Sequence, residues 1–151
     1  MDFKIGVEAI AHVIQLAVAP VFLLTGIGAL LNVLISRLGR IIDRGRKIEA
    51  MFAEAAEERR AGFDAELDTL ARRAKRVYWA ITLCTLSALL VCSVIVTAFI
   101  GAFLATDVSF WVAWLFILAL LALIGALVSF LREIVLATKS LRIRSMRHHQ
   151  S

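Results

Sequence analysis

The stretch that decides the fold is VYWAITLCTLSALLVCSVIVTAFIGAFLA, residues 77–105, which contains no charged side chain. After only TDVS, residues 106–109, a second uncharged stretch follows, FWVAWLFILALLALIGALVSFL, residues 110–131. A helix needs about 20 apolar residues to cross the hydrocarbon of a bilayer, and both stretches exceed this length. Because backbone polar groups find no water in lipid, each stretch must be a helix, and the short connection makes the two an antiparallel hairpin.

A further apolar run, from Val7 to Ile35, precedes them. The chain has 151 residues, of which 61% are hydrophobic and 19% charged, and one soluble core of this size is too small to bury so much apolar surface. We therefore predict an all-α integral membrane protein with three transmembrane helices. The predicted parts are an outer segment with the first transmembrane helix (1–35), a cytoplasmic helical hairpin (36–76), the second and third transmembrane helices (77–131) and a basic cytoplasmic tail (132–151).

The charges lie between and after the apolar runs. Residues 36–76 carry 11 Lys or Arg and 8 Asp or Glu, and residues 132–151 carry 5 Lys or Arg and one Glu. The positive-inside rule places both segments in the cytoplasm, with the N-terminus and residues 106–109 outside. The basic side chains are interleaved with acids and lack an aromatic pattern for reading bases, so we expect contacts with anionic lipid headgroups and no nucleic-acid partner.

The cytoplasmic section has the pattern of two helices. Its first arm, residues 36–60, has an apolar stripe that predicts either a coiled-coil-like seam or a helix on the membrane surface. Residues 61–64 (AGFD) predict a turn, with Gly62 as the breaker and Asp64 as an N-cap. The second arm then continues into the second transmembrane helix.

The first apolar run collects its polar side chains on one face. A repeat of three and four residues predicts a helix that packs along its length against other helices. Two interpretations remain open: the small residues and polar groups such as Asn32 hold helices together, or the face lines a conduit with Phe22 as its constriction. Pro20 lies mid-run and predicts a kink. The face comprises Glu8, His12, Gln15, Ala19, Phe22, Gly26, Ala29 and Val33, and continues into Arg37, Arg40 and Arg44.

Few other residues are candidates for chemistry. Glu133, at the inner end of the third apolar run, is a candidate for an inter-helix ion pair with Arg37 or Arg40, which lie at the same depth. Cys84 and Cys92 stand eight residues apart, too far along one helix to pair, and we expect both to be buried. The sequence has no catalytic or phosphate-binding motif and no metal-ligand spacing, so we expect no enzyme, no cofactor and no metal site.

Two segments resemble a known family. HVIQLAVAPVFLLTGIGALLN, residues 12–32, and RLGRIIDRGR, residues 37–46, followed by Glu49, are similar to segments of small bacterial membrane proteins called the domain of unknown function 2721 family. Residues 72–73, 86–88 and 130–133 also fit its layout. The resemblance implies a three-span protein of the bacterial inner membrane and no particular activity.

Three helices by themselves cover a polar face poorly, so we expect a homo-oligomer with the first transmembrane helices near its axis. The polar-to-basic face favours a channel for ions or small solutes. The alternative is a non-catalytic membrane scaffold whose cytoplasmic hairpin recruits a partner.

Overall fold

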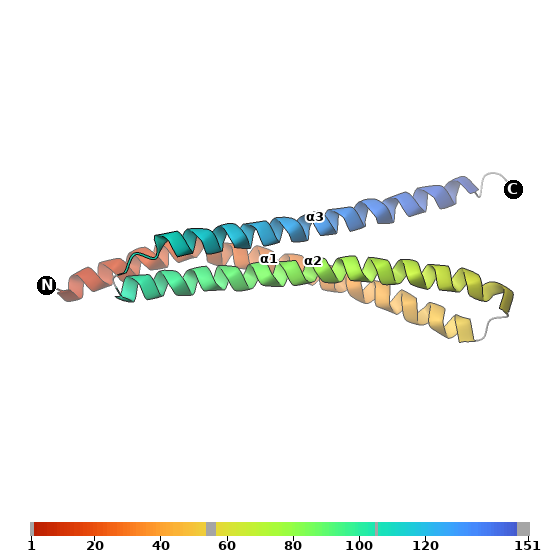
Figure 1. The fold of residues 1–151 in the computed structure, drawn as a ribbon, viewed down its shortest axis with the longest axis horizontal. Helices are drawn as coiled ribbons and strands as arrows, with labels where there is room; N and C mark the ends of the chain where they lie inside the picture. The colour runs from red at the N-terminus through yellow and green to blue at the C-terminus, as the bar shows by residue number, and fades with distance from the viewer. Residues whose placement is uncertain (1, 54–56, 105, 148–151) are drawn as a thin grey trace. The chain divides into compact units, whose positions relative to one another are not determined.

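Three long helices form the protein in this computed structural model (Figure 1). Helix α1 runs Asp2–Ala53, α2 runs Glu57–Leu104 and α3 runs Ser109–Arg147. The structure describes the backbone of residues 2–53, 57–104 and 106–147, and the side chains of 11–51 except Val13 and Leu16, of 62–104 and of 106–135. Within these ranges every residue except 106–108 is helical and no strand occurs, which confirms the all-α fold.

Each helix contains a segment long and apolar enough to cross a membrane: Ala17–Met51, Gly62–Leu104 and Ser109–Val135. The protein buries little of these segments itself, between 11% and 22% of the most apolar window of each. Apolar side chains left uncovered in this way suit a lipid solvent and not water. The chain is therefore a multi-pass membrane protein with three apolar helices, as the sequence predicts.

The chain forms two compact units, each built from parts of all three helices: residues 1–31 with 83–124, and residues 32–82 with 125–151. In the first unit, Ile27 of α1 packs at the centre with Cys84 and Val91 of α2, all at most 2% exposed. The Ser87 hydroxyl, fully buried on α2, donates a hydrogen bond of 2.8 Å to the carbonyl of Ala119 on α3. This bond ties α2 to α3 without leaving a polar group unsatisfied.

The second unit has a core of its own. Leu34 and Ile48 of α1, Val77 and Ala80 of α2, and Ala126 of α3 are all at most 1% exposed. Leu34 and Ile48 stand 14 residues apart, about four helical turns, so they lie on one face of α1. That face holds α1 against its neighbours and fixes which other side chains of α1 remain outside.

The connection between α2 and α3 is short and well capped. The Thr106 N–H donates to the Gly101 carbonyl (3.1 Å), and the Asp107 Oδ1 accepts the Ser109 N–H (3.0 Å) at the start of α3. This hydrogen bond lowers the pKa of the Asp107 carboxyl group. Gly101 is required here, because a Cβ at that position would collide with the Val108 side chain.

The predicted turn at residues 61–64 is wrong. Helix α1 ends at Ala53 and α2 begins at Glu57, so Gly62 and Asp64 lie inside α2. A glycine within a helix costs only about 1 kcal/mol, which contacts between α1 and α2 outweigh. One of these contacts is the ion pair of Arg44 with Glu66, which joins α1 to α2 at this point.

Candidate functional site

The face of α1 singled out in the sequence is exposed in the first unit. Every member whose side chain is described there is exposed, and Phe22 is 73% exposed, although His12 and Ala19 also line a cavity shared with α2 and α3. A Cβ at Gly26 or Gly28 would meet nothing within 4 Å, so the helix surface around them is open to close approach. The exposed members are His12, Gln15, Ala19, Phe22, Gly26 and Ala29, while Glu8 lies outside the described side chains.

On α1, Thr25 donates a hydrogen bond of 3.4 Å to the Val21 carbonyl one turn back. On α2, Ser93 and Thr97 donate hydrogen bonds of 2.9 and 2.8 Å to carbonyls one turn back on their own helix. His12, Gln15 and Asn32 are exposed and make no hydrogen bond with any side chain or backbone group in the described part of the chain. A partner outside α1 would satisfy these side chains where they lie in lipid.

A cavity of about 900 Å³ opens in the first unit between the three helices. Pro20, which is buried, lines it from α1, while Val94 and Ala98 line it from α2 and Phe116 from α3. Polar residues border it, among them His12, Thr106, Asp107 and Ser109. The predicted kink residue therefore lies within α1 at the wall of an apolar cavity.

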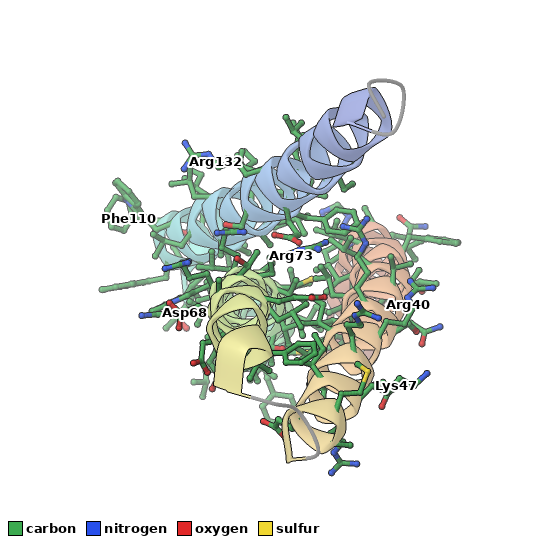
Figure 2. All side chains as sticks on the ribbon, turned by 90° about the vertical axis from the view of Figure 1, so that its right-hand side faces the viewer. Arg40, Lys47, Asp68, Arg73, Phe110 and Arg132 are labelled. Carbon is green, nitrogen blue, oxygen red and sulfur yellow. The ribbon has the colours of Figure 1, made fainter. Side chains whose placement is uncertain are left out.

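The three arginines of α1 do not share one environment. Arg40 is exposed and projects away from α2 (Figure 2). Arg44 donates from Nη2 and Nε to Glu66 Oε1, at 2.8 and 3.2 Å. Arg37 is half-buried, with its guanidinium carbon 5.3 Å from the centre of the Phe130 ring on α3.

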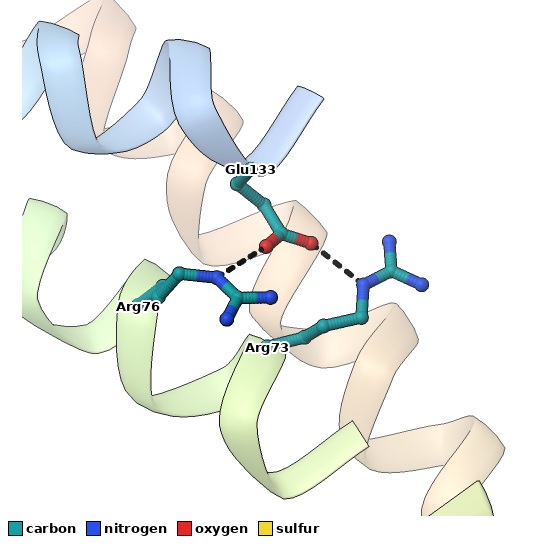
Figure 3. A network of polar contacts seen from close by, with 3 residues as sticks. All are labelled: Arg73, Arg76 and Glu133. Carbon is teal, nitrogen blue, oxygen red and sulfur yellow. Dashed lines mark hydrogen bonds and ion pairs between the residues drawn. The ribbon is translucent and has the colours of Figure 1, made fainter. Parts of the chain in front are cut away.

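Glu133 is the most deeply buried carboxylate among the described side chains, at 1% exposed. It accepts hydrogen bonds from two arginines of α2, Arg73 Nε at 2.7 Å and Arg76 Nε at 3.1 Å (Figure 3). The predicted inter-helix ion pair of Glu133 is therefore present, but its partners are Arg73 and Arg76 and not Arg37 or Arg40. Arg73 and Arg76 stand three residues apart on α2 and so face the same carboxylate, but Arg37 and Arg40 have the same spacing, which therefore could not identify the partners.

A groove of about 470 Å³ runs between α1 and α2 in the second unit. Apolar side chains such as Ile41, Leu67 and Leu70 line it, together with small residues such as Gly45. Arg46, Glu49 and Asp68 place charges of both signs along its edges. The predicted apolar stripe of the first arm therefore contributes to a groove as well as to packing, with Ile48 fully buried beneath it.

The two cysteines differ in their burial. Cys84 is buried and Cys92 is exposed, so the expectation that both are buried is wrong for Cys92. Among the described residues, no group of three or more His, Cys, Asp or Glu lies close enough together to hold a metal ion.

Comparison with known proteins gives one match. The model of a family described as "Protein of unknown function (DUF2721)" matches residues 17–143. No curated protein and no solved structure matches the chain significantly. The match covers the three apolar segments and the arginine cluster around Glu133, and it agrees with the resemblance seen in residues 12–32 and 37–46.

Proposed function

Because this chain belongs to the DUF2721 family, for which no function is known, we propose a function from the exposed polar side chains of α1 that have no hydrogen-bond partner among the described residues. The protein is a homo-oligomeric integral membrane protein, and its copies meet through the exposed face of α1. That face lines a conduit for ions or small solutes. The carrying observation is the exposure of His12, Gln15 and Asn32 within the largely apolar run 7–35.

Polar side chains in a membrane are costly to expose to lipid and face a bundle interior or a wet cavity. Ser87 and Thr97 support this interpretation by contrast, since their hydroxyl groups are satisfied within the chain. A second copy offers the same polar and small residues, and Gly26 and Ala29 let two such helices approach closely. Most oligomers are built from identical subunits, which favours a second copy as the partner.

The composition of the face favours a conduit. Phe22, exposed at 73%, lies on α1 between Gln15 and the basic end of the helix. An aromatic ring at such a place narrows a pore and excludes water from it. Of the three arginines at that end, Arg40 alone is both exposed and without a bond to another described residue. Selection for anions would therefore rest on Arg40.

The proposal includes an orientation. We place the N-terminus outside and residues 36–76 and 132–151 in the cytoplasm of a bacterium, across its inner membrane, because 16 of the 17 Lys and Arg residues lie in those two segments. Their side chains then contact the anionic headgroups of the inner leaflet. The protein has no catalytic role in this proposal.

Disulfide cross-linking and flux measurements test assembly and conduction separately. With Cys84 and Cys92 replaced by Ala, Phe22→Cys is expected to cross-link between copies in native membranes. Phe103→Cys is the matched control, because Phe103 is 86% exposed but lies on α2. Equal cross-linking at both positions would show that α1 is not the contact.

In liposomes, Phe22→Ala is expected to increase anion flux because it widens the constriction, while Phe103→Ala leaves flux unchanged. Arg40→Gln is expected to reduce the preference for anions, with exposed Arg132→Gln as control. Cross-linking through α1 without any flux would support assembly and refute the conduit.

A scaffold is the second candidate, and the groove between α1 and α2 favours it. Its apolar lining and mixed charges suit an amphipathic helix of a partner protein. Leu67→Asp places a charge in that lining and is expected to abolish partner capture while leaving the α1 cross-link intact. If no partner depends on Leu67, the scaffold role is refuted.

A further inference from the structure

Three arginines converge on one turn of α3 in the second unit. Arg73 and Arg76 of α2 bind Glu133, and the Arg37 guanidinium lies over Phe130, three residues before Glu133. Residues three apart on a helix are neighbours on its surface. Two helices therefore present guanidinium groups to the same short surface of α3.

The charges in this cluster do not balance. Glu133 supplies one negative charge against three positive ones, and both of its bonds use the Nε atoms of the arginines. Figure 3 shows the terminal nitrogens of Arg73 directed away from the carboxylate. The Nη1 atom of Arg37 is buried and has no hydrogen-bond partner among the described residues. A buried donor without a partner is destabilising, so a bound acceptor would remove that cost.

The location of the cluster points to the acceptor. Arg73 and Arg76 come directly before the uncharged run 77–105, and Glu133 comes directly after the uncharged run 110–131. Lipid phosphates lie at this boundary between hydrocarbon and water. Guanidinium groups match the oxygens of a phosphate in a two-pronged geometry, and basic pockets between membrane helices bind anionic headgroups.

We propose that Arg37, Arg73 and Arg76 form a specific site for the phosphate group of an anionic phospholipid. Glu133 holds Arg73 and Arg76 in position and keeps them from repelling each other. The lipid phosphate then accepts hydrogen bonds from Arg37 and from the terminal nitrogens of the other two. This site does not depend on a conduit along α1 or on the oligomeric state.

The test uses the full chain in nanodiscs of phosphatidylcholine, with or without a minority of phosphatidylglycerol. Lipid retained after mild detergent release is counted by native mass spectrometry, and the midpoint of thermal unfolding is measured in each disc. We expect phosphatidylglycerol to be retained and to raise the midpoint, because a ligand of the folded state stabilises it. Arg37→Gln should reduce retention about tenfold, the effect of losing one charge-assisted hydrogen bond. Arg40→Gln is the control, since Arg40 is exposed one turn away.

A second variant separates binding from folding. Glu133→Gln should lower the midpoint in phosphatidylcholine. Because glutamine keeps the shape and one acceptor oxygen for the arginines and removes the charge that competes with the phosphate for them, this variant should retain phosphatidylglycerol at least as well as the wild type. If Arg37→Gln does not fold, Arg37→Lys replaces it; this variant keeps the charge without the fork and should show intermediate retention.

Two results would overturn the proposal. Equal loss of lipid in Arg37→Gln and Arg40→Gln would indicate diffuse surface charge and no specific site. Inorganic phosphate that raises the midpoint in phosphatidylcholine discs as much as phosphatidylglycerol does would indicate a site for the free anion.

Discussion

Replacing Glu133 by Gln tests how the second unit is held together. The carboxylate is 1% exposed and accepts bonds of 2.7 and 3.1 Å from Arg73 and Arg76, whose side chains are 30% and 37% exposed. Glutamine keeps the shape and one acceptor oxygen but removes the charge that offsets two guanidinium groups. Breaking a buried ion pair by removing one partner costs about 3–5 kcal/mol. Because both arginines are partly exposed and can turn toward water, we expect about 3 kcal/mol, at the low end of this range.

The matched control is Glu66→Gln, which breaks the other ion pair between helices. Arg44 and Glu66 are also 2.8 Å apart, but their side chains are 51% and 41% exposed. An exposed pair of this kind contributes about 0–1 kcal/mol. The two substitutions thus remove the same chemical group at similar distances, and they differ in burial and in the number of arginines bound, two for Glu133 and one for Glu66.

The assay is reversible unfolding in mixed micelles by increasing sodium dodecyl sulfate, followed by tryptophan fluorescence. We expect the free energy of unfolding to fall about 3 kcal/mol for Glu133→Gln and under about 1 kcal/mol for Glu66→Gln. Equal losses in the two variants would refute the argument that burial gives the Glu133 network its strength.

Three further predictions concern the first unit and its connection. Gly101→Ala should destabilise the α2–α3 connection by about 1–3 kcal/mol, because its Cβ collides with Val108; the same unfolding assay measures it, and no loss would show that the loop shifts freely. Ser87→Ala should cost about 1 kcal/mol, since it leaves its bond to the Ala119 carbonyl unmade, and an unchanged free energy would contradict the role of this bond. Because its hydrogen bond lowers the pKa of Asp107, the ionised carboxylate stabilises the fold at pH values above the ordinary aspartate pKa of 3.8. This stabilisation is lost as the pH falls through the lowered pKa. Asp107→Asn should remove this part of the acid dependence of the unfolding midpoint, and a variant with the wild-type profile would refute the assignment.

Hydropathy alone determined the three apolar helices and the loop between α2 and α3. Residues 77–105 and 110–131 have no charge, so only a helix in lipid suits them, and the polar residues 106–109 leave one place for the connection. The sequence also predicted which residues share a face of α1, because its polar and small residues recur at the spacing of one helical face. Only the structure shows that these residues are exposed in a single copy of the chain.

The prediction from sequence that the first arm ends at a turn over residues 61–64 is wrong. Gly62 and Asp64 have the composition of a turn, and local propensity alone cannot show that α2 continues through them. Packing decides this point: Ile48 is fully buried, and Arg44 reaches Glu66, so the helical course of α2 is set by its contacts with α1. Tertiary contacts of this kind override a propensity of about 1 kcal/mol.

The pairing of charges was likewise decided by the tertiary structure. Arg37, Arg40, Arg73 and Arg76 all stand beside apolar runs, and the sequence gives no rule for choosing which of them binds Glu133. The rotation of each helix about its own axis decides the pairing. Burial of Leu34 and Ile48 turns Arg40 outward and Arg37 toward Phe130. Burial of Val77 and Ala80 brings Arg73 and Arg76 to α3. The sequence by itself thus determined which segments enter lipid, since transfer from water depends on composition. Only packing determined which side chains meet, since that depends on how each helix is turned.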